Sequence, residues 1–234
     1  MIPVYDDNPT TLKPVVTVVM IVLCALAFFW ELSLPLQAKQ EMIYGLGVIP
    51  AVLIGNKALP PEIQTVPPAL TVLTSMFLHI GLMHLIGNML YLWIFGNNVE
   101  DAMGHGRFTV FYLLCGIAAA LTQTLLQPSS AIPMIGASGA VSGVLGAYLL
   151  LYPFARVTVI IPLGFFLQAF QLPASIVLVF WFLIQLISSG LNSSQEGGVA
   201  FFAHIGGFIA GMILIPFFKH HNISFFQSRR IKRI

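Results

Sequence analysis

Charged residues are scarce in this chain of 234 residues, since only 8% are Asp, Glu, Lys or Arg while 58% are hydrophobic. Soluble domains typically carry about 25% charged residues. Several stretches without charge approach the roughly 20 residues that cross a bilayer as a helix. Ten-residue segments of alternating hydrophobicity, the pattern of a transmembrane barrel, are absent. We therefore expect an all-α, polytopic membrane protein.

Cysteine and concentrated charge are also scarce. The two cysteines, Cys24 and Cys115, both lie in apolar runs and indicate no disulfide framework. The formal net charge is only +2, and positive charge gathers only in the tail that begins at Lys219. This distribution does not favour a nucleic acid as partner, and the tail is typical of a cytoplasmic anchor.

Motifs for metal or paired-carboxylate chemistry are missing as well. His79 and His84 are five residues apart and lack the glutamate of an H-E-x-x-H zinc motif. The acids near apolar runs, Glu31 and Glu100, lie close to the ends of those runs and do not form the pair that an aspartyl protease needs. We expect no metal and no other cofactor.

Six apolar segments are expected to cross the membrane. Their approximate ranges are 14–34, 78–95, 108–126, 138–153, 172–187 and 199–218. The segment 37–77 mixes charges and prolines with apolar patches, which predicts an extracytoplasmic loop that lies on the membrane. The sequence "GNNVEDAMGHGR" predicts a polar turn after the second span. We expect the stretch that follows Val157, broken by Pro162, to form an interfacial or re-entrant connector.

An even number of spans places both termini on one side. If that side is cytoplasmic, eight of the ten basic residues lie inside and only Lys39 and Lys57 lie outside, as the positive-inside rule requires. We therefore expect a short cytoplasmic tail at 1–13, a membrane domain at 14–218 and a basic cytoplasmic tail at 219–234. The expected location is a prokaryotic cell membrane, which the chain crosses several times.

Four polar side chains share one depth in this topology. Ser138 begins a short helix and thus lies beneath the outer surface, and His204 lies about 8 Å into its own helix at 1.5 Å per residue. His84 and Asn88 are four residues apart and share a helix face. Polar groups at such depth are costly and usually face the interior of the bundle. We take this layer as the candidate site.

Ser138 and His204 each have a simpler structural interpretation. Within "GASGAVSG" a serine can serve close helix packing, and His204 can be a satisfied core histidine. However, two small-residue faces predict that the helices at 138–153 and 199–218 pack together, so that Ser138 would face His204. These faces consist of Gly139 and Gly143 on one helix and Gly207 and Gly211 on the other.

This pairing would supply the chemistry of acyl transfer. A serine hydroxyl is a weak nucleophile that needs a base, and histidine is a base near neutral pH. His84, Asn88 and the backbone N–H of Ser138 are donor types suited to an oxyanion. No Asp or Glu is expected in the layer, so we predict a Ser–His dyad without the third carboxylate of a triad.

Three stretches together resemble the rhomboid family of intramembrane serine proteases. They are "FLHIGLMHLIGNMLYLWIFGNNVED", "GASGAVSGVLGAY" and "AHIGGFIAG", and the resemblance runs from about Thr71 to Phe218. It implies a six-helix bundle in which Ser138 is the nucleophile and His204 the general base. It also implies that His84 and Asn88 supply the oxyanion hole. Gly136 matches the glycine of the family's G-x-S-G motif, which implies that it belongs to the oxyanion hole and keeps the backbone open beside the oxyanion. His79 matches a recurrent histidine of the family that we assign to hydration or structure.

The resemblance further implies an endopeptidase of the lipid bilayer. Its substrates would be single-pass membrane proteins, cut in or near the transmembrane segment where the helix can unwind. The alternative is a catalytically inactive rhomboid-like protein that binds transmembrane clients for trafficking or degradation.

Overall fold

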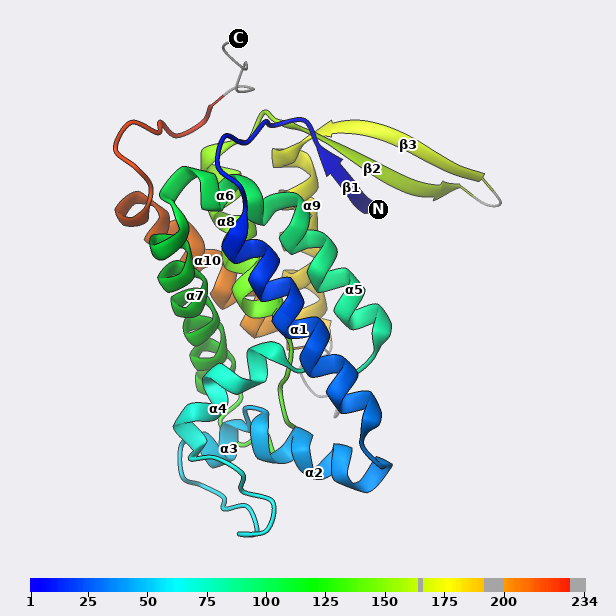
Figure 1. The fold of residues 1–234 in the computed structure, drawn as a ribbon, viewed down its shortest axis with the longest axis vertical. Helices are drawn as coiled ribbons and strands as arrows, with labels where there is room; N and C mark the ends of the chain where they lie inside the picture. Colours follow the sequence, from blue (N-terminus) through cyan, green and yellow to red (C-terminus); the bar gives the residue numbers. More distant parts are fainter. Residues whose placement is uncertain (164–165, 192–199, 228–234) are drawn as a thin grey trace.

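The computed structural model describes residues 1–163, 166–191 and 200–227 as a bundle of helices with a small sheet at one end (Figure 1). The helices are α1 (Val15–Ser33), α2 (Leu36–Leu46), α3 (Pro50–Leu53), α4 (Pro68–Thr74), α5 (Leu82–Tyr91), α6 (Asn97–Met103), α7 (His105–Leu126), α8 (Ser138–Leu151), α9 (Ala174–Leu191) and α10 (Phe201–Phe218). The strands are β1 (Ile2–Asp6), β2 (Arg156–Leu163) and β3 (Phe166–Pro173). A 3₁₀ turn covers Ser75–Phe77, and the π-helical segment Leu92–Gly96 joins α5 to α6.

Apolar helices occupy all six predicted positions, which confirms a helical membrane bundle. In the described part of the chain, α1, α7 and α10 are each long and apolar enough to cross a membrane. A fourth crossing results if Pro68–Phe77 and Leu82–Met103, which meet at a bend of 83°, form one broken span. Because α8 and α9 are shorter apolar helices, the number of six spans stays a prediction.

The N-terminal strand and the end of α10 lie at the same end of the bundle, whereas α2 runs across the opposite end (Figure 1). This arrangement agrees with an even number of passes between the two termini. The assignment of that end to the cytoplasm stays a prediction, as does the division into two tails and a membrane domain.

The expectation of an all-α fold was wrong, because β1, β2 and β3 form an antiparallel sheet. The hairpin of β2 and β3 replaces the predicted connector after Val157, and β1 comes from the segment predicted as a polar tail (Figure 1). Val157 and Val159 are fully buried and alternate with the half-buried Thr158 and Ile160. This period of two in a β-branched run favours a strand. Because nearly every residue of the run is apolar, the sequence does not show this alternation.

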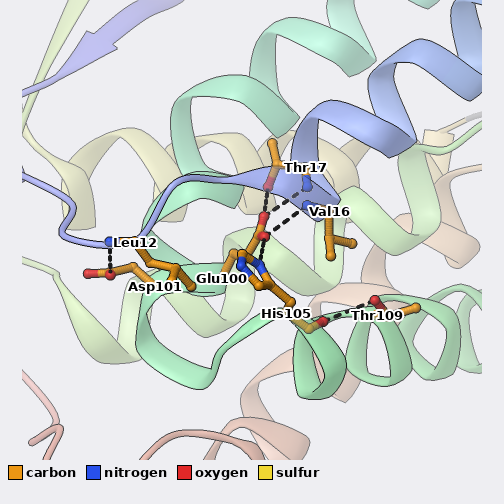
Figure 2. Close-up of polar contacts among 7 residues, drawn as sticks. All are labelled: Leu12, Val16, Thr17, Glu100, Asp101, His105 and Thr109. Atoms are coloured by element: carbon orange, nitrogen blue, oxygen red, sulfur yellow. Dashed lines mark hydrogen bonds and ion pairs between the residues drawn. The ribbon is translucent and has the colours of Figure 1, made fainter.

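The predicted polar turn "GNNVEDAMGHGR" was also wrong, because α6 continues the helix to Met103 and α7 starts at His105. Glu100 in this segment is fully buried. Its Oε1 accepts the backbone N–H of Val16 at 2.9 Å, and its Oε2 accepts the N–H and hydroxyl of Thr17 at 2.8 and 2.7 Å (Figure 2). Glu100 thus satisfies the free N–H groups at the start of α1, where Pro14 offers no side-chain cap.

Two further contacts strengthen this junction. His105 Nδ1 lies 2.6 Å from Glu100 Oε1, and the backbone N–H of Leu12 donates to Asp101 Oδ1 at 2.8 Å (Figure 2). The acidic side chains therefore tie the beginning of α1 to the end of α6. Leu12 and Val16 are more than 80 residues from these acids in sequence, which explains why the segment resembles a solvated turn when only its own sequence is considered.

Strand β1 ends in a buried polar cluster that joins it to the helices. Asp6 Oδ2 accepts the hydroxyl of Tyr148 on α8 at 2.6 Å and the amide of Asn98 on α6 at 3.0 Å. Asn8 donates to Asn98 Oδ1 at 2.7 Å. Burial of Asp6 removes its carboxyl from water and raises its pKa to about 6, against the opposing effect of the hydrogen bond from Tyr148.

Helices α8 and α10 pack with their backbones in contact, as the two small-residue faces predict. A Cβ built on Gly207 would overlap the carbonyl oxygen of Gly139, and one built on Gly211 would overlap that of Gly143. In lipid, where apolar side chains gain little by leaving the solvent, such close approach supplies the packing energy. This contact sets the distance between Ser138, at the start of α8, and His204, on α10.

We expect substitution of Gly207 by Ala to separate the two helices. The added methyl group meets backbone, which side-chain rotation cannot relieve, so the free energy of unfolding should fall by about 1–3 kcal/mol. The matched control is Gly87→Ala on α5, where a Cβ meets nothing within 4 Å. Thermal unfolding in detergent should show a lower midpoint for Gly207→Ala than for Gly87→Ala, and equal midpoints would contradict the packing described.

We also expect β1 to dock more firmly in mild acid. Because the pKa of Asp6 is raised in the folded protein, folding favours the protonated carboxyl. This contribution, up to about 3 kcal/mol, is complete below about pH 4 and is lost as the pH rises through about 6. Hydrogen exchange of the β1 amides, corrected for intrinsic rates, should therefore be slower at pH 5 than at pH 7.5. The Asp6→Asn variant should lose this difference between pH 5 and pH 7.5. If the difference persists in the variant, another group causes it.

Candidate active site

Ser138 stands at the first position of α8, after a loop shaped by Gly136. Gly136 has a backbone φ of +127°, which residues other than glycine rarely adopt. Its N–H donates to the carbonyl of Ser75 at 2.9 Å. A Cβ at Gly136 would lie 2.8 Å from Cε1 of His84. The missing side chain therefore provides both the turn and the space for the His84 ring beside the serine.

His204 lies in the first turns of α10 and meets Ser138 directly. Its Nε2 is 2.8 Å from Ser138 Oγ, and its Nδ1 is 2.8 Å from Oε1 of Gln185 on α9. The His204 residue is 8% exposed, while Ser138 is half-buried. The structure thus brings together the two residues that the small-residue faces paired. Their catalytic roles stay predictions.

The first turn of α10 is fixed by an amide from α7. Gln123 Oε1 accepts the backbone N–H of Ala203 at 3.1 Å, and Gln123 Nε2 donates to Gln127 Oε1 at 2.7 Å. The same N–H also lies 3.1 Å from the carbonyl of Ala200, so Gln123 shares it with the backbone at the helix start. This second acceptor ties the turn that carries His204 to α7.

His84 and Asn88 are placed differently, although they share a face of α5. His84 lines the same cavity as Ser138 and His204. Asn88 is buried, its Nδ2 donates to the backbone carbonyl of His84 at 3.0 Å, and it is absent from the described residues that line the cavity. The structure therefore brings His84 to the site and leaves Asn88 behind it, one helical turn away.

His79 supports the site from the break between the 3₁₀ turn and α5. It is fully buried, and its ring centroid is 5.2 Å from that of His84. Its backbone N–H donates to Oε1 of Glu31 at 3.0 Å, and its Nδ1 lies 3.2 Å from the carbonyl of Phe77. Glu31 is completely buried, so this acid near the end of α1 anchors the break in the chain. From the sequence, Glu31 is only an acid near the end of an apolar run, and its distant partner His79 is not evident.

A cavity of about 400 Å³ opens onto the serine. Ser138, His204, His84 and Gly136 line it together with polar and apolar side chains of the loop before α8 and of α7. The hydroxyl of Ser138 can pass its proton to Nε2 of His204, and the positive end of α8 favours a developing anion beside Ser138. Within the described ranges, no three His, Cys, Asp or Glu residues cluster in a way that could hold a metal ion.

Gln185 is the site residue that sequence reasoning missed. The available signal was one glutamine within the apolar stretch "FWFLIQLI". A polar side chain in a transmembrane helix is costly and usually faces a partner. Its partner could not be named without the rotation of α9 about its axis.

Comparison with known proteins finds a rhomboid family model and several rhomboid relatives. Residues 68–221, more than half of the chain, match the family model described as the rhomboid domain. The rhomboid protease GluP of Bacillus subtilis (strain 168) is 46% identical over 77 residues, which are 33% of this chain and 15% of that protein. Rhomboid-like protein 11, chloroplastic, of Arabidopsis thaliana is 29% identical over 150 residues, which are 61% of this chain and 50% of the relative.

A third relative extends the range of compartments. Rhomboid protein 1, mitochondrial, of Saccharomyces cerevisiae is 29% identical over 148 residues, which cover 62% of this chain and 40% of the relative. The alignments with these three relatives therefore span half or less of each relative's length. They agree with an integral membrane protein, and the prokaryotic membrane stays a prediction.

We expect Gly136→Ala to destabilise the loop before Ser138 by more than its backbone strain alone. The control is Gly55→Ala, because Gly55 also has a positive φ, +79°, but a Cβ there meets nothing within 4 Å. The control should cost about 1–2 kcal/mol from backbone strain. Gly136→Ala should cost more, because a φ of +127° is less accessible to alanine than +79° and because its methyl group also displaces the His84 ring. Thermal unfolding of both variants checks this order, and an equal loss would contradict it.

Proposed function

The chain belongs to the rhomboid family, and from this premise we propose that it is an intramembrane serine endopeptidase that hydrolyses peptide bonds in or near transmembrane segments. The observation that carries the proposal is the 2.8 Å contact between Ser138 Oγ and His204 Nε2. The contact borders a cavity, so a substrate carbonyl has room to approach the hydroxyl. A small-residue packing role for Ser138 would not require a histidine nitrogen at this distance.

The proposed reaction proceeds through an acyl-enzyme. Ser138 Oγ attacks the scissile carbonyl while its proton moves to Nε2 of His204. The oxyanion accepts hydrogen bonds from the backbone N–H of Ser138 and from His84, while Asn88 supports His84 from behind through its hydrogen bond to the His84 carbonyl. His204 then protonates the leaving amine. A water molecule, deprotonated by His204, hydrolyses the ester and restores the serine.

The proposed substrates are single-pass membrane proteins. Peptide bonds in a transmembrane helix are shielded by their own hydrogen bonds, so the helix must open locally before a carbonyl can reach Ser138. Gly or Pro in the substrate helix would lower the cost of that opening. A substrate helix from the bilayer and water must therefore both reach Ser138. The position of Ser138 at the start of a short helix is in keeping with this requirement.

We also propose a topology for the chain. Both termini would face the cytoplasm of a prokaryotic cell, with residues 1–13 and 219–234 as tails, because this places most basic residues inside. The segment 37–77 would then lie on the outer surface of the membrane.

We expect a fluorophosphonate to label the detergent-solubilised protein at Ser138. Ser138→Ala should abolish labelling because it removes the nucleophile. Ser142→Ala should keep it, since the Ser142 hydroxyl donates to the Ser138 carbonyl within the same helix. Equal labelling of the protein and Ser138→Ala would refute the assignment of the nucleophile.

His204→Ala should reduce cleavage of a model transmembrane substrate in liposomes by about 10³-fold or more, because Ser138 loses its base. The fold should remain, since α8 and α10 pack through glycines. Near-normal cleavage by this variant would contradict the dyad. If the unaltered protein neither reacts with the probe nor cleaves, while it still binds transmembrane helices, the result favours the inactive client-binding alternative.

A further inference from the structure

Gln185 is an amide in a position where serine hydrolases commonly carry a carboxylate. It lies on α9, is 8% exposed, and presents Oε1 to His204 Nδ1 at 2.8 Å. An amide oxygen has no proton, so the imidazole must donate in this hydrogen bond. The contact therefore places the single proton of a neutral imidazole on Nδ1.

The position of that proton determines what His204 can do. With the proton on Nδ1, Nε2 keeps its lone pair and points it at the Ser138 hydroxyl 2.8 Å away. In the opposite tautomer Nε2 carries the proton and cannot accept one from the serine. The hydrogen bond to Gln185 thus favours the only neutral form of His204 that can serve as a base.

The same helix also fixes the plane of the imidazole. Trp181 precedes Gln185 by four residues, so both side chains lie on one face of α9. The ring centroids of Trp181 and His204 are 5.9 Å apart, with an angle of 39° between the planes. The ring centroids of Phe201 and His204 are 6.5 Å apart, and the two planes are perpendicular. His204 is therefore held by aromatic contacts as well as by the hydrogen bond at Nδ1.

A general role in joining helices does not account for this geometry. A glutamine that only links α9 to α10 could bond to any polar atom of α10, whereas Gln185 meets the nitrogen opposite the one that faces Ser138. The neutral amide cannot offset the charge of an imidazolium as the aspartate of a triad does. Its contribution is therefore confined to tautomer and orientation.

We propose that Gln185 is a positioning residue that holds His204 in the Nδ1–H tautomer, so that a site without a third carboxylate still orients its base. This inference rests on the proposed function for its effect on rate. The hydrogen bond itself can be tested without any reaction.

The test compares two substitutions of similar size at this position. Gln185→Leu removes the acceptor, and Gln185→Glu keeps an oxygen that can accept the Nδ1 proton. Gln168→Leu makes the same change at an exposed position of β3 and is the matched control. Each protein is labelled with ¹⁵N-histidine, the His204 signals are assigned by their loss in His204→Ala, and thermal midpoints are recorded.

The ¹⁵N shifts should report the Nδ1–H tautomer for His204 in the unaltered protein, in Gln168→Leu and in Gln185→Glu. Gln185→Leu should shift His204 toward the Nε2–H form. Its kcat for a model transmembrane substrate should fall at least about tenfold with little change in KM, because the substrate cavity is unchanged while the base is misplaced. Gln185→Glu should retain more of kcat than Gln185→Leu.

An unchanged tautomer and unchanged kcat in Gln185→Leu would overturn the inference. If that variant does not fold, loss of the Nδ1–H form in a folded Gln185→Glu protein would overturn it as well. Failure of the proposed function has a different signature, because the unaltered protein would then be as inert as Ser138→Ala whatever the tautomer of His204. The NMR measurement still decides the role of Gln185 in that case.

Discussion

Direct backbone contact between α8 and α10 is the constraint on which the rest of the structure depends. Gly207 and Gly211 lie against the carbonyls of Gly139 and Gly143, at a separation that leaves no space for a Cβ. Larger side chains would keep the helices farther apart and would carry His204 away from Ser138. The 2.8 Å contact between Ser138 and His204 is therefore a consequence of small residues that themselves have no reactive groups.

Buried polar side chains attach the remaining elements to this pair of helices. Glu100 accepts the N–H groups at the start of α1, and Gln123 accepts one at the start of α10. Asp6 links the sheet to α8. In each case a side chain from a distant part of the sequence satisfies a group that lipid cannot satisfy. These contacts give the bundle specific orientations that apolar packing alone would leave degenerate.

The sequence was sufficient for features that appear as a regular pattern along a helix. The apolar runs located the helices, and the spacing of glycines on two of them, combined with depth, paired Ser138 with His204. Single polar side chains whose distant partners follow no such pattern were not predictable in this way. Glu100 looked like part of a solvated turn because its partners lie at the start of α1, and Gln185 needed the rotation of α9. The hairpin after Val157 is different, because its alternation is one of burial, which an almost continuous run of β-branched residues does not show in the sequence.

Helix α8 connects Ser138 with the base of the sheet. Ser138 opens it, and Tyr148, ten residues later, bonds to Asp6 beneath the sheet. At 1.5 Å per residue the two points are about 15 Å apart along the axis. Displacement of β1 would therefore leave the Tyr148 hydroxyl without its carboxylate partner, at one end of the helix whose other end carries Ser138.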